Sequence, residues 1–348
     1  MKSVFLVLVA LIMWGASCKD VTSAEKDKVK LNKSVNDLTI GFYNVENIYD
    51  TSDDPNTLDN DFTPSGKYEW TPDRYKTKLD RVSEVLSLMD NDLPDVVGLC
   101  EIENKGVLED LIATSLLRPG QYGIVHYDSP DERGIDVALI YKRSVLELEH
   151  SEKIKVVLPV NEDPNTRDIL YVRAKAGGQA LHFFVNHWPS RRAGQQESEP
   201  SRIKAAEIVK TRMDAILSSD PSARILMMGD FNDYPTDKSI REVIGASGNR
   251  GGLFYNTVDS LNAIGQGSYW YKGAWNALDQ IIISNSLVSG NEGWVLDNSR
   301  PVRFINDERL LFRDREGVAR PNRTYVGDDY KGGYSDHLAV VSYFKRRE

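Results

Sequence analysis

Short apolar runs recur along this chain, and they constrain its fold more than any other feature of the sequence. Each run is rich in Val, Ile, Leu or aromatic residues and is bounded by Gly, Pro, Asn or Asp, which is typical of β-strands. The runs lie at 38–43, 95–100, 137–141, 154–158, 169–172, 181–185, 224–228, 280–283 and 338–344. The chain is therefore expected to build its core from many short strands.

Helical periodicity separates some of these runs. Thr71 and Pro72 form a good N-cap and first-turn pair, and apolar residues then follow at helical spacing. Further helices are expected at 201–217, 106–117 and 236–244. Because strands and helices mix without strict alternation, the pattern favours mixed sheets with helices outside over a simple doubly wound parallel sheet.

The polar, Arg-rich segment 298–333 has little periodicity. Long segments of this kind in a compact domain are usually functional or disordered.

The first residues are typical of an exported lipoprotein. Lys2 precedes an apolar run at 4–14, and Gly15-Ala16-Ser17-Cys18 resembles a bacterial lipobox. We therefore expect a lipoprotein signal peptide at 1–18, a flexible tether at 19–36 and one large domain at 37–348. An ordinary cleaved signal peptide is the alternative. The expected location is a lipid anchor in the bacterial outer membrane, facing either the periplasm or the surface.

Charge and cysteine content narrow the possible functions. The formal net charge is −9. Long duplex DNA is itself negatively charged and does not attract a protein of this charge, although a local Arg cluster can override the net charge. The chain has two cysteines, too few for a structural Cys₄ zinc site. Cys100 follows an apolar run, so we expect a buried, inert thiol.

Residues suited to metal and acid–base chemistry stand at the ends of the apolar runs. If the strands share one core, these ends meet along one edge, where rigid strands hold side chains that face solvent. Carboxylate and amide oxygens suit Mg²⁺, and histidine suits proton transfer. No serine or cysteine nucleophile signature accompanies them, which favours attack by water. The residues are Asn44, Glu101, His187, Asp230, Asn232, Asp279, Asp336 and His337.

Six segments that contain these residues resemble, in the same order, the motifs of the endonuclease/exonuclease/phosphatase superfamily. They are FYNVEN at 42–47, LCE at 99–101, NHW at 186–188, GDFND at 229–233, LDQ at 278–280 and YSDH at 334–337. Each motif alone is weak, but six in order are specific. The resemblance implies an α/β fold, a four-layer sandwich of two mixed β-sheets face to face, flanked by helices.

The resemblance also implies a metal site. Glu101 would be the principal ligand, with Asn44 and Asp336 near the metal directly or through water. Mg²⁺ is the expected ion, with Mn²⁺ or Ca²⁺ as alternatives.

The implied catalytic roles surround this metal. His337, oriented by Asp279, would contact the scissile phosphate or exchange a proton with it, and Asp230 would position or deprotonate the attacking water. Asn232 would donate to a phosphate oxygen, and His187 would contact phosphate or assist the leaving group.

Arg133 is a further expected phosphate contact, although an exposed loop arginine is unremarkable. Trp188, Trp270 and Trp275 either line a substrate groove or pack within the sandwich. The segments 129–141 and 321–325 do not match the DNA-gripping loops expected of a repair endonuclease, so the substrate stays open.

The sequence therefore predicts a Mg²⁺-dependent phosphodiesterase that hydrolyses phosphate esters, such as DNA or RNA, by in-line attack of water. A phosphomonoesterase or phospholipid-head-group hydrolase is the alternative within the enzyme class. A catalytically inactive surface binding module and a calcium-stabilised structural protein are alternatives from other classes. We expect a monomer that touches the membrane only through its anchor.

Overall fold

The computed structural model describes residues 36–158, 165–192 and 194–348. The expected signal peptide and all of the expected tether except its last residue lie outside these ranges. Within them, no helix is both long enough and apolar enough to cross a membrane.

Two seven-stranded sheets form the centre of the fold. The first has the order β14-β20-β1-β2-β4-β3, with β15 also paired to β20. It is mixed, since β1 is parallel to β2 and antiparallel to β20. Its strands are β1 (Asp37–Ile48), β2 (Val96–Ile102), β3 (Tyr122–His126), β4 (Asp136–Lys142), β14 (Gly293–Leu296), β15 (Arg303–Phe304) and β20 (Val340–Arg347).

The second sheet is also mixed and has the order β5-β6-β7-β8-β13-β10-β9. β7 and β8 are parallel, whereas β8 and β13 are antiparallel. Its strands are β5 (Leu146–Ile154), β6 (Ile169–Ala176), β7 (Gln179–His187), β8 (Arg224–Asp230), β9 (Ala246–Ser247), β10 (Phe254–Asn256) and β13 (Asp279–Ser284).

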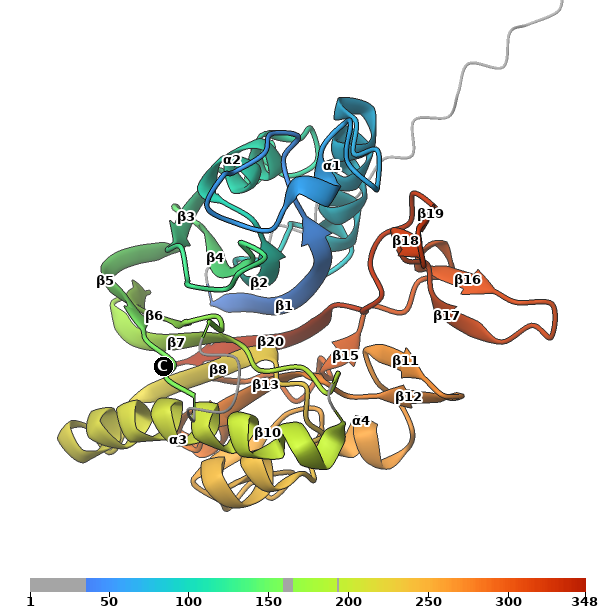
Figure 1. Cartoon of the computed structure of the whole chain (residues 1–348). Helices are drawn as coiled ribbons and strands as arrows, with labels where there is room; N and C mark the ends of the chain where they lie inside the picture. The colour runs from blue at the N-terminus through green and yellow to red at the C-terminus, as the bar shows by residue number, and fades with distance from the viewer. Residues whose placement is uncertain (1–35, 159–164, 193) are drawn as a thin grey trace, which may run out of the picture. The chain divides into compact units, whose positions relative to one another are not determined.

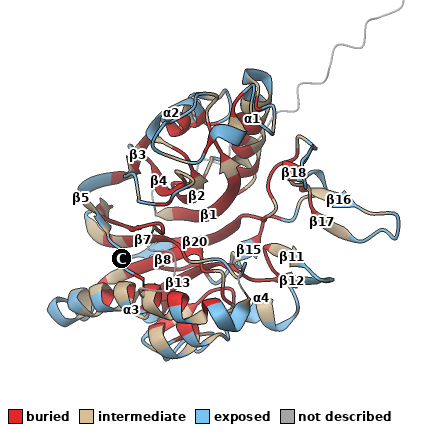
Figure 2. Ribbon diagram, viewed as in Figure 1, coloured by how far each residue is buried: buried red, intermediate tan, exposed pale blue. Residues whose placement is uncertain are grey.

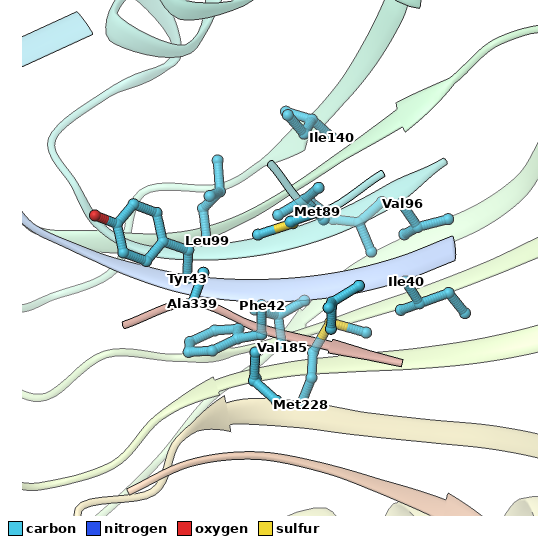
Figure 3. Close-up of a cluster of buried hydrophobic side chains, with 14 of the residues drawn as sticks. Ile40, Phe42, Tyr43, Met89, Val96, Leu99, Ile140, Val185, Met228 and Ala339 are labelled. Carbon is cyan, nitrogen blue, oxygen red and sulfur yellow. The ribbon is translucent and has the colours of Figure 1, made fainter. Parts of the chain in front are cut away.

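The two sheets pack face to face through apolar side chains. Phe42 from the first sheet shares one buried cluster with Val185 and Met228 from the second (Figure 3). Gly98 permits the close approach, because a Cβ at this position would lie 2.6 Å from the Met228 sulfur. Removing this apolar surface from water is the main force that holds the sheets together.

Helices cover the outer faces of both sheets (Figure 1). Thr71 caps α1 (Pro72–Ser87), which lies with α2 (Lys105–Ala113) against the first sheet. On the other side, α3 (Gln195–Ser219) and the π-helix η3 (Ser239–Ile244) share a second buried cluster with the strands of the second sheet. Figure 2 shows the buried faces of these helices turned toward the sheets. The predicted four-layer α/β sandwich is confirmed.

Some element boundaries differ from the prediction. The run at 154–158 is not a strand: only Ile154 belongs to β5, which precedes it. The sequence of β5 is largely exposed and charged, so it has no apolar signal of its own. Helix α3 begins at Gln195, earlier than expected, and carries Pro200 within it, while α2 ends at Ala113.

Small hairpins occupy much of the polar segment 298–333, which the sequence left unassigned (Figure 1). They lie on the same side of the sandwich as another short hairpin. The strands of this group are β11 (Tyr269–Tyr271), β12 (Ala274–Asn276), β16 (Leu311–Arg313), β17 (Ala319–Pro321), β18 (Tyr325–Val326) and β19 (Asp329–Tyr330). The remaining short helices are η1 (Asn60–Phe62), η2 (Arg118–Gly120), α4 (Asp259–Ala263), α5 (Ser286–Ser289) and η4 (Glu308–Leu310).

Candidate active site

Strand register brings three of the predicted residues to one level of the second sheet. His187 at the end of β7 pairs with Asp230 at the end of β8. Asp230 pairs in turn with Asp279 at the start of β13. Because β13 runs antiparallel to β8, the beginning of β13 lies beside the end of β8. The clustering expected from the ends of the apolar runs is therefore a consequence of this pairing.

Asn44 joins the two sheets at this point. Its side-chain nitrogen lies 3.2 Å from Glu101 Oε1 and 3.0 Å from Asp230 Oδ2 and donates to both carboxylates. Its side-chain oxygen accepts from the backbone N–H of Glu46. In this arrangement the amide orients the two carboxylates.

Glu101 lies on β2 in an unusual backbone conformation. Its φ of 65° is in the left-handed region, which costs a non-glycine residue about 1–3 kcal/mol. The β1–β2 register shifts beside it, between Asn44 and Ile48. The carboxylate accepts a hydrogen bond from the Asn47 N–H and lies 3.8 Å from His187 Nε2. The surrounding structure thus holds an acidic side chain at the site in a conformation that the isolated chain disfavours.

His337 is held by Asp279. Its Nδ1 lies 2.6 Å from Asp279 Oδ2, and its Nε2 lies 3.8 Å from Asp230 Oδ2. Burial lowers the pKa of His337, but the nearby carboxylates of Asp279, Asp230 and Asp336 outweigh this and raise it well above its usual range. The ring of Tyr269 packs against the imidazole, 4.8 Å between centroids. These contacts orient the ring and favour its protonated form.

His187 has the opposite electrostatic character. Burial lowers its pKa well below the usual range, and the charges of Arg167, Arg133 and His337 lower it further. Its Nδ1 is buried and has no hydrogen-bond partner among the described residues. The pKa values of the two imidazoles are therefore shifted in opposite directions, and Asp230 Oδ2 is within 3.9 Å of each Nε2.

Asn232 lies two residues beyond Asp230, in the left-handed region with a φ of 49°. Its N–H donates to Asp230 Oδ1, and its side-chain nitrogen donates to the Trp188 carbonyl. Trp188 itself is buried against Phe231, so it packs within the sandwich.

Arg133 forms an ion pair with Asp131, with 3.2 Å between Nε and Oδ1. Burial lowers the pKa of Arg133, but the carboxylates of Asp131 and Glu101 outweigh burial, so the pKa is raised overall. Its side chain is 38% exposed, so it is accessible to a ligand that binds from solvent.

Asp336 belongs to a second ionic group, which the sequence did not reveal. Arg323 bridges Asp336 Oδ2 and Glu46 Oε1, at 3.0 Å from each. Burial and the charge of Asp336 raise the pKa of Glu46. Glu46 lies in the FYNVEN motif, whereas Arg323 carried no signal because its segment lacks periodicity.

Two buried cations were also missed. Lys78 of α1 donates to Thr324 Oγ1 and to the Tyr334 carbonyl, and burial lowers its pKa to about 8. Arg167 binds Asp131 and the Trp188 carbonyl. Each comes from a segment with no motif, so only the tertiary structure locates it.

The described residues include groups that can hold a metal ion. Ligand atoms of Asp230, Asp279 and His337 lie within 4.8 Å of one another, as do those of His126, Asp128 and Asp136. In the first group His337 Nδ1 is already bonded to Asp279, so the trio is better described as an acid–base arrangement. The carboxylate of Glu101, beside Asp230 and the amide of Asn44, supplies the oxygen donors that a hard divalent cation prefers.

Cys100 is buried and free, and burial raises the pKa of its thiol well above the usual range. The expectation that this thiol is buried is confirmed.

Comparison with known proteins defines the family. The model of the Endonuclease/Exonuclease/phosphatase family matches residues 39–346. The chain therefore belongs to this family, which makes it a hydrolase of phosphate esters. No curated protein sequence matches the chain.

Solved structures share its fold. An endonuclease/exonuclease/phosphatase family protein from Bacteroides thetaiotaomicron is similar with a TM-score of 0.57 and 14% identity, over 89% of this chain and 98% of the other. A mannosyl-6-phosphatase from the same organism is similar with a TM-score of 0.56 and 16% identity, over 88% of this chain and 99% of the other. D. rerio TDP2 complexed with single-strand DNA product is similar with a TM-score of 0.53 and 16% identity, over 89% of this chain and 99% of the other. At these identities the likeness concerns the fold alone.

Proposed function

We propose that this protein is a Mg²⁺-dependent phosphodiesterase, exported and lipid-anchored at a bacterial outer membrane, that hydrolyses its substrate by in-line attack of water. The observation that carries the proposal is the position of one buried carboxylate between two imidazoles. Asp230 Oδ2 lies 3.9 Å from His187 Nε2 and 3.8 Å from His337 Nε2, and Asp279 holds His337 through Nδ1. Burial lowers the pKa of His187, whereas the neighbouring carboxylates raise the pKa of His337.

The side chains have distinct tasks in this proposal. The imidazolium of His337 donates from Nε2 to a phosphate oxygen and stabilises the negative charge that grows there. Burial raises the pKa of Asp230, which makes this carboxylate a better acceptor for the proton of the attacking water. Asn232 keeps one side-chain N–H available besides the one given to Trp188, and this N–H donates to phosphate.

Arg133 and His187 complete the set in this account. The exposed part of the Arg133 guanidinium binds a phosphate oxygen. Neutral His187 donates a hydrogen bond to phosphate or to the leaving group.

Glu101, Asn44 and Asp336 are the residues proposed to hold Mg²⁺ near the substrate. When bound, the ion would neutralise phosphate charge and polarise the ester. Asn44 also orients Glu101 and Asp230, and Arg323 orients Asp336, so the oxygen donors are held in place before any ion arrives.

Phosphomonoester hydrolysis is a second candidate, favoured by the shared fold of the mannosyl-6-phosphatase. The single-strand DNA product in the TDP2 structure instead favours a nucleic-acid diester. A surface module without activity has less support, because the acidic residues and both histidines are all present and lie together at one site.

The test is hydrolysis by a soluble form that begins at residue 19. The substrates are supercoiled plasmid, RNA, a chromogenic phosphodiester and a chromogenic phosphomonoester, each with Mg²⁺ and with EDTA. The proposal expects diester cleavage that requires Mg²⁺. Cleavage of monoesters alone would replace it with the second candidate, and equal turnover in EDTA would contradict the metal requirement.

A further inference from the structure

A pocket of about 520 Å³ opens beside the catalytic residues. The hairpins β11–β12, β16–β17 and β18–β19 and the segment between them supply its walls. Figure 1 shows these hairpins, in orange and red, on the same side of the sandwich. Its lining includes Tyr269, Trp270, Phe312, Arg320, Arg323 and Lys331.

The pocket is continuous with the active site. Tyr269 lines it and packs on His337, and Arg323 lines it and binds Asp336. A group in the pocket would therefore lie next to a phosphate bound at His337. Its volume is in the range of small-molecule sites and suits a group the size of a nucleoside.

Aromatic side chains remain open to solvent on the pocket wall. Phe312 is 52% exposed, and Trp270 and Tyr269 are only half buried. The apolar side chain of Val326, also in the lining, is 54% exposed. Exposed apolar groups gathered at one concave site mark a binding surface. Flat aromatic rings of this kind bind nucleobases by stacking.

Cations flank these aromatic rings. Arg320 lies over Phe312, with its guanidinium carbon 5.7 Å from the ring centroid. Its side chain is 42% exposed and forms an ion pair with Asp314. The Lys331 side chain is 45% exposed and forms an ion pair with Asp329. Such exposed ion pairs are weak, so either cation can exchange its partner for a phosphate group.

The wall that carries these groups is fixed. Tyr334 N–H donates to the Asn322 carbonyl, and Asn322 N–H donates to the Leu310 carbonyl. Gly333 is needed at the crossing, because a Cβ there would lie 2.2 Å from the Asn322 oxygen. The pocket is thus formed before a ligand arrives, which lowers the entropy cost of binding.

We propose that this pocket binds a nucleoside next to the scissile phosphate, with its base stacked on Phe312 and Trp270 and a second phosphate at Arg320 or Lys331. The substrate class is accordingly a nucleotide with more than one phosphate, or the end of a single-stranded nucleic acid. The proposal rests on phosphate-ester hydrolysis by the adjoining site, and it restricts that activity to nucleotide substrates.

Binding measured without turnover tests the proposal separately from catalysis. We would titrate the soluble protein in EDTA with adenosine 3′,5′-bisphosphate and with ribose 5-phosphate, using calorimetry. The expected result is binding of the bisphosphate at least about tenfold tighter than of ribose 5-phosphate, since the bisphosphate adds a second phosphate and a stacked base, and the base alone contributes about this factor or more. Phe312→Ala should remove the share of the base, about tenfold in affinity for the bisphosphate, without changing the affinity for ribose 5-phosphate. Arg320→Gln should weaken only the bisphosphate.

Leu253→Ala is the matched control, because Leu253 is 53% exposed and lies outside the pocket lining. It should bind both probes as the wild type does. Equal affinity for the two probes, or an unchanged Phe312→Ala variant, would overturn the proposal.

A lipid surface is the competing occupant. Binding to phosphatidylglycerol vesicles that Phe312→Ala abolishes, without binding of the bisphosphate, would overturn the nucleotide assignment. Because hydrolysis is not the readout, an inactive protein that binds the bisphosphate through Phe312 would contradict the proposed function and leave the pocket assignment standing.

Discussion

At the scale of single residues, the site depends on one acidic side chain that controls a histidine. Asp279 is fully buried, and its Oδ1 has no hydrogen-bond partner among the described residues. Its other oxygen holds His337 Nδ1. Asp279 therefore fixes the ring orientation and raises the pKa of the imidazole.

Asp279→Asn should lower the pKa of His337, because burial continues to favour the neutral ring while the main opposing charge is lost. The wild-type histidine stays protonated as pH rises through neutrality, whereas the variant should lose its proton at or below its ordinary pKa of about 6.5. We expect turnover to fall by about 10²- to 10⁴-fold at pH 7 and to fall further as pH rises.

The measurement is the pH profile of kcat/KM for both proteins. Asp220→Asn, at an exposed aspartate, is the control and should leave the profile unchanged. A variant profile that matches the wild type would show that Asp279 does not set the charge of His337.

At the scale of elements, the contact between β2 and β8 determines how closely the two sheets approach. Gly98→Ala would place a Cβ 2.6 Å from the Met228 sulfur and 3.1 Å from the Phe42 ring. Overpacking of this kind typically destabilises a core by about 1–3 kcal/mol. We expect a loss of this size in the free energy of unfolding by urea.

Two further variants make that expectation specific. Gly251→Ala, where the nearest atom is 3.5 Å away, should have little effect on stability. In the Gly98→Ala/Met228→Ala double variant the losses should be less than additive, because the clash is gone. Strict additivity would mean that the inter-sheet contact is not the cause.

Element prediction from sequence succeeded where apolar signal was strong. The central strands β1, β2, β4, β7 and β8 are buried along nearly their whole length, so their sequences are continuous apolar runs. The edge strand β5 is exposed and charged and gave no such signal. The hairpins at 311–330 are too short for a periodic pattern, so only tertiary packing defines them.

At the scale of the whole molecule, the candidate site could be predicted in part. The residues at the ends of the central strands were identified, because register carries them to one edge. Arg323, Lys78 and Arg167 were not, since each reaches the site from a distant segment. The pocket was beyond prediction for the same reason: its walls combine separate hairpins.

Stability should depend on pH through Glu103, the residue that directly follows β2. Burial and the charges of Asp50, Asp59 and Asp54 raise its pKa to about 8, despite an opposing hydrogen bond from the Asp50 N–H. The unfolded chain releases this proton near pH 4.3, so between that pH and about 8 the folded state binds one proton more. The free energy of unfolding should therefore decrease as pH rises through this interval.

Glu103→Gln should remove this contribution, because glutamine keeps the acceptor oxygen and cannot ionise. The variant should gain stability relative to the wild type as pH rises, with the largest gain at pH 8 and above. Urea denaturation at pH 5 and pH 8.5 measures the difference. A constant difference between the two proteins at both pH values would contradict the raised pKa.

The most direct test of the central claim is turnover by Glu101→Gln in the presence of Mg²⁺. The substitution keeps the shape of the side chain and removes its charge beside Asn44 and Asp230. Glu109→Gln, on the exposed face of α2, is the matched control. If Glu101 holds the ion that phosphate-ester hydrolysis requires, Glu101→Gln should lose at least about 100-fold in kcat/KM while Glu109→Gln keeps wild-type activity. Wild-type turnover by a folded Glu101→Gln protein would contradict the account of this site.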